Sequence, residues 1–320
     1  SAQITLQPQW VNGELAGQPV NTKATRFPQM GISYPVPGAN GTAVLQIGSY
    51  LDQRWEVQQE YEEDLLGRPV TFTDKFSSDG GVSTVQLGWA QRLGDDLSLG
   101  VGVGTRIGNV TRTFLRTIES GGEFTVVPFR TGGEWQYSGL TAAFSFQWDP
   151  IEAVRLGGAV NWSQELKAEK DEEASESPET FDLPIEFRFG ASGILTPRLA
   201  VTAGFTYADW KTSNVILAGE SSPIGATWSY GGGIEWAGPR WRVRNFPFRL
   251  GIRRSALPFL FEGEEPKENV LTGGIGLNLI PQELGFVGAV DIGVERGDRK
   301  AGSLSESFWR ASLTFRVGSF

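Results

Sequence analysis

The side chains in this sequence best suited to chemistry are arginines and carboxylates, and many of them recur at alternate positions. Arg249 and Arg253, for example, lie on either side of the apolar pair Leu250 and Ile252. A planar guanidinium matches a carboxylate, so such arginines predict either ion pairs or a guide for the polar head of a ligand, with Arg249 and Arg253 as first candidates. The full set is Arg106, Arg155, Glu186, Arg188, Glu235, Arg249, Arg253, Asp291, Glu295, Arg310 and Arg316.

The sequence contains no cysteine and no histidine. This composition excludes disulfides, zinc sites built on Cys or His, and nucleophiles that a histidine activates. We therefore expect a protein that is not an enzyme, with no catalytic residues, no cofactor and no metal. The net charge of −9 and the pI near 4.8 argue against nucleic acid as a partner, because phosphates call for clustered Lys and Arg.

Apolar residues alternate with small or polar ones along most of the chain, which indicates strands that face two environments. In one such segment Leu97, Leu99, Val101 and Val103 alternate with Ser98, Gly100, Gly102 and Gly104. A soluble sandwich would carry many Lys and Glu on its second face, whereas here that face is mostly Gly, Ser, Thr and isolated charges. The lumen of a transmembrane barrel fits this pattern better. No apolar run approaches the roughly 18 residues of a membrane-spanning helix.

The alternation predicts an all-β fold, a transmembrane antiparallel β-barrel of about 14 strands. The expected strands are 3–12, 25–36, 42–58, 82–92, 97–115, 135–148, 153–165, 183–194, 198–211, 224–237, 246–256, 269–280, 284–296 and 305–319. Every second connection is short, and the intervening ones are longer, notably 59–81, 116–134, 166–182 and 257–268. Short periplasmic turns and longer extracellular loops produce this regular difference, so both termini are expected in the periplasm.

These features predict a single outer-membrane barrel domain over residues 1–320, in a bacterial outer membrane. Because the first residues carry neither a basic start nor an apolar core, we expect any signal peptide to have been removed already. The acidic stretch 167–181 is expected to be a hydrophilic loop, with divalent-cation bridging to lipopolysaccharide as the alternative. Ser49 and Gln53 interrupt an otherwise apolar strand face, which indicates either a wall opening or exposure at the membrane interface.

Two ion pairs follow from the expected hairpins inside the barrel. Closing the hairpin through Pro239 brings Glu235 near Arg249, and pairing the last two strands brings Asp291 near Arg310. In one interpretation the inward charges form a structural ion-pair network, and in the other they guide a substrate's polar head. Abundant inward glycine indicates either close approach to the wall or sharply bent strands.

Two stretches of the second half resemble a known family. They are residues 197–210, which end in Asp209-Trp210, and residues 246–253 with Leu257-Pro258-Phe259 and the Gly-rich strand 272–279. They are similar to the FadL-type outer-membrane transport proteins, a family that includes PorV-like members. The resemblance implies fourteen strands and passive uptake of long-chain fatty acids or other hydrophobic compounds, commonly with a lateral exit. It also implies an N-terminal plug with an Asn-Pro-Ala motif, and this motif has no match here. The terminal Phe320 does not fall in the two-residue alternation of Leu313, Phe315 and Val317.

The leading functional hypothesis is therefore uptake of hydrophobic small molecules. Leu257, Phe259, Leu260 and Phe261 are the expected apolar docking patch, with an interface belt as the alternative. Outer-membrane lipids and lipopolysaccharide are expected partners. The competing hypotheses are a structural or adaptor barrel with a protein partner in a surface or secretion assembly, and a general diffusion porin.

Overall fold

The structure is a computed structural model that describes most of the chain. The described residues are 1–15, 18–65, 68–120, 128–170, 179–212, 225–237, 240–241, 244–258, 260, 263–279 and 286–319. They form an all-β architecture, with one short 3-10 helix, η1 (Trp210–Thr212). No helix among these residues is long and apolar enough to cross a membrane.

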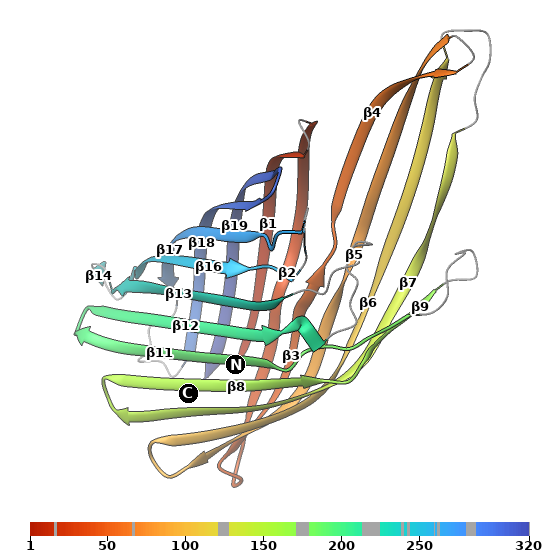
Figure 1. Ribbon diagram of the computed structural model, residues 1–320. Coiled ribbons are helices and arrows are strands. Elements are labelled where there is room, and N and C mark those ends of the chain that lie inside the picture. Colours follow the sequence, from red (N-terminus) through yellow and green to blue (C-terminus); the bar gives the residue numbers. More distant parts are fainter. Residues whose placement is uncertain are drawn as a thin grey trace.

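The strands follow one another along the chain and pair with their sequence neighbours (Figure 1). They are β1 (Ala2–Leu15), β2 (Gln18–Val36), β3 (Gly41–Asp52), β4 (Trp55–Leu65), β5 (Arg68–Leu93), β6 (Leu97–Ser120), β7 (Phe129–Ile151), β8 (Val154–Ser163), β9 (Leu166–Lys170), β10 (Glu179–Phe181), β11 (Glu186–Thr196), β12 (Leu199–Asp209), β13 (Ala226–Trp236), β16 (Phe248–Ala256), β17 (Lys267–Asn278), β18 (Phe286–Ala301) and β19 (Leu304–Ser319). A small separate ladder joins β14 (Arg240–Trp241) and β15 (Arg244–Asn245).

The sheet closes on itself because β1 pairs with β2 on one side and with β19 on the other. Three strands of the barrel are interrupted, so that β3 and β4, β8 and β9, and β10 and β11 are each the two parts of one strand. The barrel therefore has fourteen antiparallel strands, as the sequence predicts. Closure removes the free edges that an open sheet would expose.

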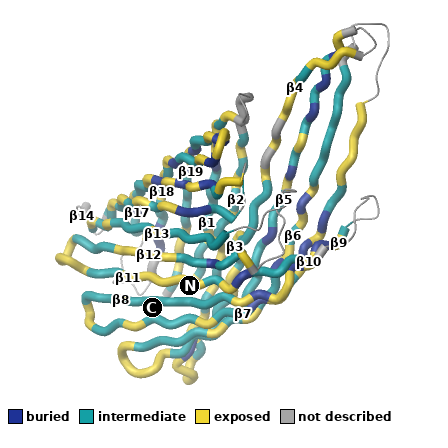
Figure 2. Tube along the Cα trace, in the orientation of Figure 1, coloured by how far each residue is buried: buried dark blue, intermediate teal, exposed yellow. Residues whose placement is uncertain are grey.

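Large apolar side chains cover the outside of the barrel. Exposed residues alternate with less exposed ones along β16 and in the middle of β18, and the colour changes along β18 in Figure 2. Trp148 and Trp236 lie on this surface at the end with the short turns, and Trp162 and Trp309 lie on it farther from that end. This outward arrangement is the one that a hydrocarbon environment favours.

The predicted short turns are found at one end of the barrel, but the predicted long loops at the other end are partly wrong. Residues 37–40, 94–96, 152–153 and 197–198 are short turns at the end that holds both termini. At the other end, the expected loop 59–81 is wrong: β4 and β5 pair there from Trp55/Ser78 to Leu65/Arg68. The two-residue alternation simply continues through Phe72 and Phe76, although the intervening positions are very polar.

Other expected loops are also partly strand. β6 continues to Ser120 and β7 begins at Phe129, while β9 and β10 take up both ends of the acidic stretch 167–181. Residues 171–178 of that stretch lie outside the described residues. As a result, β4 to β7 rise well beyond the other strands (Figure 1). We call their upper part, residues 55–80, 110–120 and 129–135, the projecting sheet.

Candidate functional site

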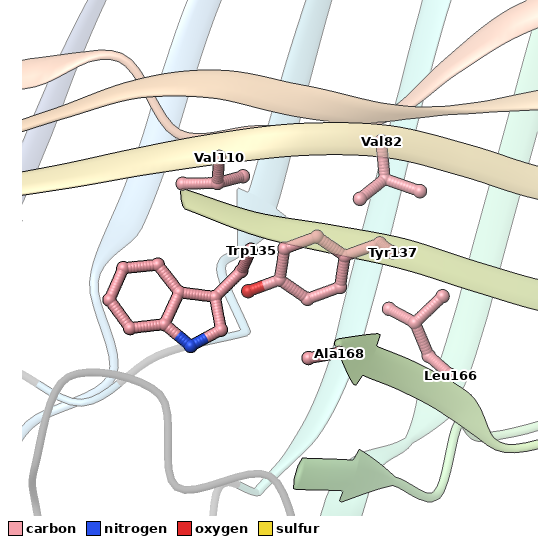
Figure 3. Close-up of a cluster of buried hydrophobic side chains, with 6 residues drawn as sticks. All are labelled: Val82, Val110, Trp135, Tyr137, Leu166 and Ala168. Atoms are coloured by element: carbon pink, nitrogen blue, oxygen red, sulfur yellow. The ribbon is translucent and has the colours of Figure 1, made fainter. Parts of the chain in front are cut away.

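A cluster of apolar side chains lies inside the barrel near the base of the projecting sheet. It consists of Val82, Val110, Trp135, Tyr137, Leu166 and Ala168, all buried (Figure 3). These residues come from β5, β6, β7 and β9, and their positions alternate with those of the lipid-facing side chains. They therefore line the lumen, where a water-filled channel would carry polar groups.

The interruptions in the barrel strands add further apolar groups to this cluster. The register between β3 and β5 shifts between Ser49 and Leu51, and Tyr50 and Leu51 pack against the cluster. Phe181 and Leu183, where β10 leads into β11, pack against it from the other side. We call these ten residues the neck.

Arg106 is a charged residue that lies against the neck. It is only 6% exposed, and its guanidinium carbon lies 3.4 Å from the centroid of the Tyr50 ring. Its Nε and Nη1 atoms are buried without a hydrogen-bond partner among the described residues. A buried cation with unused N–H groups is costly unless an anion or a polar group reaches it.

The inner face of the projecting sheet continues the apolar surface of the neck. Tyr61 stacks on Phe72 at 5.4 Å between ring centroids, Phe76 lies 4.7 Å from Phe114, and Phe114 lies 6.3 Å from Phe129. Phe76 and Phe129 are 40% and 58% exposed. The β5–β6 register has no shift between Ser120 and Leu97, so this face and the lumen face are one surface.

An ion pair fixes β5 to β6 within this aromatic face. Arg116 donates from Nε and Nη2 to the two carboxylate oxygens of Asp74 at 2.7 and 2.6 Å. These hydrogen bonds hold the pKa of Asp74 below its ordinary value. The Arg116 guanidinium also lies 5.5 Å from the Phe114 ring, so it stiffens the sheet without breaking the apolar surface.

Glycines on β6, at the neck and below it, allow close packing of the wall itself. A Cβ at Gly104 would lie 2.1 Å from the Val85 carbonyl oxygen, and one at Gly108 would lie 2.0 Å from that of Gly81. These contacts favour the second of the two interpretations of inward glycine, in which neighbouring strands bend together closely.

On the opposite wall the inward charges pair with one another. Glu235 accepts from Arg249 Nε at 2.6 Å, so the predicted pair is confirmed. Asp291 accepts from Arg249 Nη1 and Arg316 Nη2, each at 2.5 Å. The expected pair between Asp291 and Arg310 is wrong, because the β18–β19 register places Arg310 opposite Glu295.

A second group of pairs centres on Glu268, which the sequence did not single out. Its carboxylate lies 3.2 Å from Arg253, 3.0 Å from Arg299 and 3.1 Å from Arg310. Arg310 further donates to Gln9 at 2.8 Å, across the closing seam between β1 and β19, and lies 3.3 Å from Glu295. The expected strand began at residue 269, which left Glu268 in a loop.

The remaining inward charges form local pairs. Arg155 donates to Asp149 at 2.8 Å, and Arg188 donates to Glu186 of its own strand. By alternation the eleven charges singled out by the sequence lie opposite the exposed apolar side chains, on the lumen side. Among the described residues, Arg106 is the one of the eleven without an ion pair. Of the expected docking patch, Leu257 and Leu260 are half-buried, and Phe259 and Phe261 lie outside the described residues.

The wall is discontinuous beside the neck. The ladder between β2 and β3 ends at the pair Gln29 and Gly48, and β4 pairs only with β5 among the described residues. Side chains bridge the base of this gap instead: Arg54 donates to the Thr25 carbonyl at 2.7 Å, and Arg26 lies 2.5 Å from Asp52. Ser49 and Gln53, the residues that indicated an opening, flank this interruption.

Comparison with known proteins identifies the fold. No protein-family model and no curated protein matches the chain. Among solved structures it is similar to the toluene transporter TbuX of Ralstonia pickettii, with 14% identity, a TM-score of 0.62, and coverage of 100% of this chain and 89% of that one. A FadL homologue of Pseudomonas aeruginosa and the toluene transporter TodX of Pseudomonas putida each give 12% identity and a TM-score of 0.59. Both comparisons cover 98% of this chain, with 89% and 88% of the respective relatives.

At these identities the comparisons establish the fold. The chain has the outer-membrane-type barrel fold of the FadL-type hydrophobic-compound channels, as its late hairpins predicted. These structural neighbours are transport channels and not enzymes.

Proposed function

We propose that the chain is a bacterial outer-membrane barrel for passive uptake of hydrophobic compounds, with no enzymatic activity. The observation that carries this proposal is the neck, an apolar and aromatic cluster inside a barrel whose outside is already apolar. A porin for hydrated solutes would gain nothing from such a lining, so general diffusion is the less supported alternative. The transport neighbours, two of them toluene transporters, support the same role.

The aromatic face of the projecting sheet is the proposed first docking surface. Phe76, Phe114 and Phe129 lie on the inner face of this sheet, beyond the neck, and burying their area against a ligand contributes about 25 cal/mol per Å². The same face of the sheet continues from Phe76, past Ser78 and Gly80, to Val82 in the neck. This face replaces the patch around Leu257 as our preferred site of capture.

Arg106 is the proposed contact for a polar head. Arg249 and Arg253, the first candidates from the sequence, are held by carboxylates and serve the ion-pair network of the wall. Arg106 keeps two buried nitrogens free beside apolar groups. A long-chain fatty acid would place its carboxylate there and its chain along the neck. The gap between β2 and β4 lies beside the same position and supports a lateral exit.

The test uses Gram-negative cells that lack other channels for a labelled hydrophobic compound and express this chain. We expect Phe76→Ser with Phe129→Ser to lower the initial uptake rate by roughly tenfold at low concentration, equivalent to about 1.4 kcal/mol of capture free energy. Leu115→Ser, on the opposite face of the same sheet, is the matched control and should leave uptake unchanged. Uptake by the wild type that does not exceed that of cells without the protein would reject the proposed function.

A second candidate, an adaptor barrel in a surface or secretion assembly, is supported by a different feature. Within the described residues, one edge of β4 (Trp55–Leu65) has no partner strand, and such an edge can receive a strand of another protein. Purification in mild detergent separates the two functions. A stoichiometric protein partner with no uptake activity favours the adaptor, and a lone barrel with uptake activity favours the transporter.

A further inference from the structure

A groove runs over the lipid-facing surface of the wall formed by β13, β16, β17 and β18. Its volume is about 570 Å³, and it passes over Gly231 and Gly232, where no side chain fills the surface. Tyr230, Ile252 and Leu271 supply its apolar side chains. A groove of this composition fits a hydrocarbon chain.

Basic side chains border one end of this groove. Arg254 and Arg296 belong to its lining, and Lys267 and Lys300 face each other on neighbouring strands just beyond it. All four are exposed, and alternation places them on the outside of the barrel. Asp298 is the acidic group among them, and it accepts a hydrogen bond from Asn269 at 3.3 Å.

These four cations differ from the arginines of the lumen. None of the four lies within 4.0 Å of a carboxylate oxygen in the part of the chain that the structure describes. The four cations make this surface locally positive, although the net charge of the chain is −9. The patch is therefore suited to an external anion.

The position of the patch along the barrel identifies that anion. Ile252, Leu271, Arg296 and Trp309 are cross-strand neighbours in one row, and below this row the outward side chains are apolar. The Arg296 guanidinium lies 5.4 Å from the Trp309 ring, a typical arrangement at a membrane interface. The row is at the end of the barrel away from the short turns and the termini, which is the outer leaflet in the proposed orientation.

We propose that this surface is a binding site for a phosphorylated lipid of the outer leaflet. The phosphate would lie between Arg254, Arg296 and the two lysines, where guanidinium and ammonium groups donate charge-assisted hydrogen bonds. One acyl chain would lie in the groove over Ile252 and Leu271. This inference rests on the proposed outer-membrane location, and it is independent of transport.

The experiment measures lipid retention by native mass spectrometry of the purified barrel in detergent. The probes are lipid A with both phosphates and the same lipid after removal of its phosphates. We expect the wild type to retain the phosphorylated form at least about tenfold better, because several charge-assisted hydrogen bonds depend on the phosphate. The variant R254Q/K267Q/R296Q/K300Q should lose this preference.

The matched control is K23Q/R130Q, which removes two outward cations from other parts of the wall. Heat-modifiable migration in gels verifies that each variant is folded. Equal retention of both lipids by the folded wild type, or an equal loss in the control variant, overturns the inference. A wild type that retains the phosphorylated lipid but shows no uptake would reject the proposed transport and leave this site standing.

Discussion

Two buried arginines on opposite walls of the lumen have almost the same exposure and very different surroundings. Arg310 is 7% exposed and Arg106 is 6% exposed. Arg310 reaches Glu268, Glu295 and Gln9, whereas Arg106 rests on the Tyr50 ring with two nitrogens unused. Burial of a charged side chain in the lumen therefore does not by itself reveal the role of that side chain. The partners of the charge distinguish a structural pair from a site open to a ligand.

The strand order explains why the structural network lies where it does. β19 and β1 join the two ends of the chain, and Arg310 bridges this closure by its hydrogen bond to Gln9. Phe308 is fully buried next to Val11 and Val270, and the Arg310 guanidinium lies 4.0 Å from its ring. The closing wall thus has a small core of its own, an apolar group with ion pairs on both sides of it.

Among the variants that test this difference between the two walls, Glu268→Gln should have the largest effect. This change leaves Arg253, Arg299 and Arg310 without their shared carboxylate, and removing one partner of a buried charge network costs about 3 kcal/mol or more. Urea unfolding of the barrel in lipid vesicles, followed by tryptophan fluorescence, measures the change in the free energy of unfolding. Glu235→Gln is the matched control in the same lumen. Its pair with Arg249 is well exposed, so the expected loss is under about 1 kcal/mol.

If Glu268→Gln and Glu235→Gln lowered the free energy of unfolding equally, water would screen both groups of charges in the lumen to the same extent. The distinction between a structural wall and a binding wall would then fail.

A second test of this difference is to neutralise Arg310 and Arg106, one at a time. Arg310→Gln should destabilise the barrel by about 3 kcal/mol, because it leaves Glu268 and Glu295 less compensated. Arg106→Gln removes a charge that has no carboxylate partner, so stability should change by less than about 1 kcal/mol. Instead, uptake of a labelled fatty acid should fall relative to that of the alcohol with the same chain. An unchanged ratio of acid to alcohol uptake would remove Arg106 from the binding site.

The two walls also differ in how far the sequence predicts them. Alternation predicts which charges point inward, and all eleven lie on the lumen side. It does not supply the register between distant strands, which is why Glu235 with Arg249, neighbours in one hairpin, was predicted correctly and Asp291 with Arg310 was not. Glu268 was missed because it lies beyond the predicted start of its strand. Strand ends are the least certain part of a prediction from pattern.

The neck could not be predicted for a physical reason. Its residues come from strands whose alternation is ordinary, and only the interruptions near Gln53, Glu165 and Asp182 bring them together. Interruptions of this kind depend on pairing with neighbouring strands and not on local composition. Much of the projecting sheet falls within the predicted loops 59–81 and 116–134, because polar side chains dominate one face of β4 and of the upper part of β5.

The smallest expected effect concerns a third paired arginine, Arg116, which lies in the projecting sheet beyond the membrane. Its hydrogen bonds hold the pKa of Asp74 below the ordinary value of about 3.9. The pair therefore stabilises the sheet fully above that value, and the contribution is lost as the pH falls through the lower pKa of the folded state. Hydrogen exchange of peptides from residues 68–80, corrected for intrinsic rates, should show less protection at about pH 3 than at about pH 6. Asp74→Asn should remove most of this difference, and a wild type with equal protection at both values would show that the aromatic contacts alone hold the sheet together.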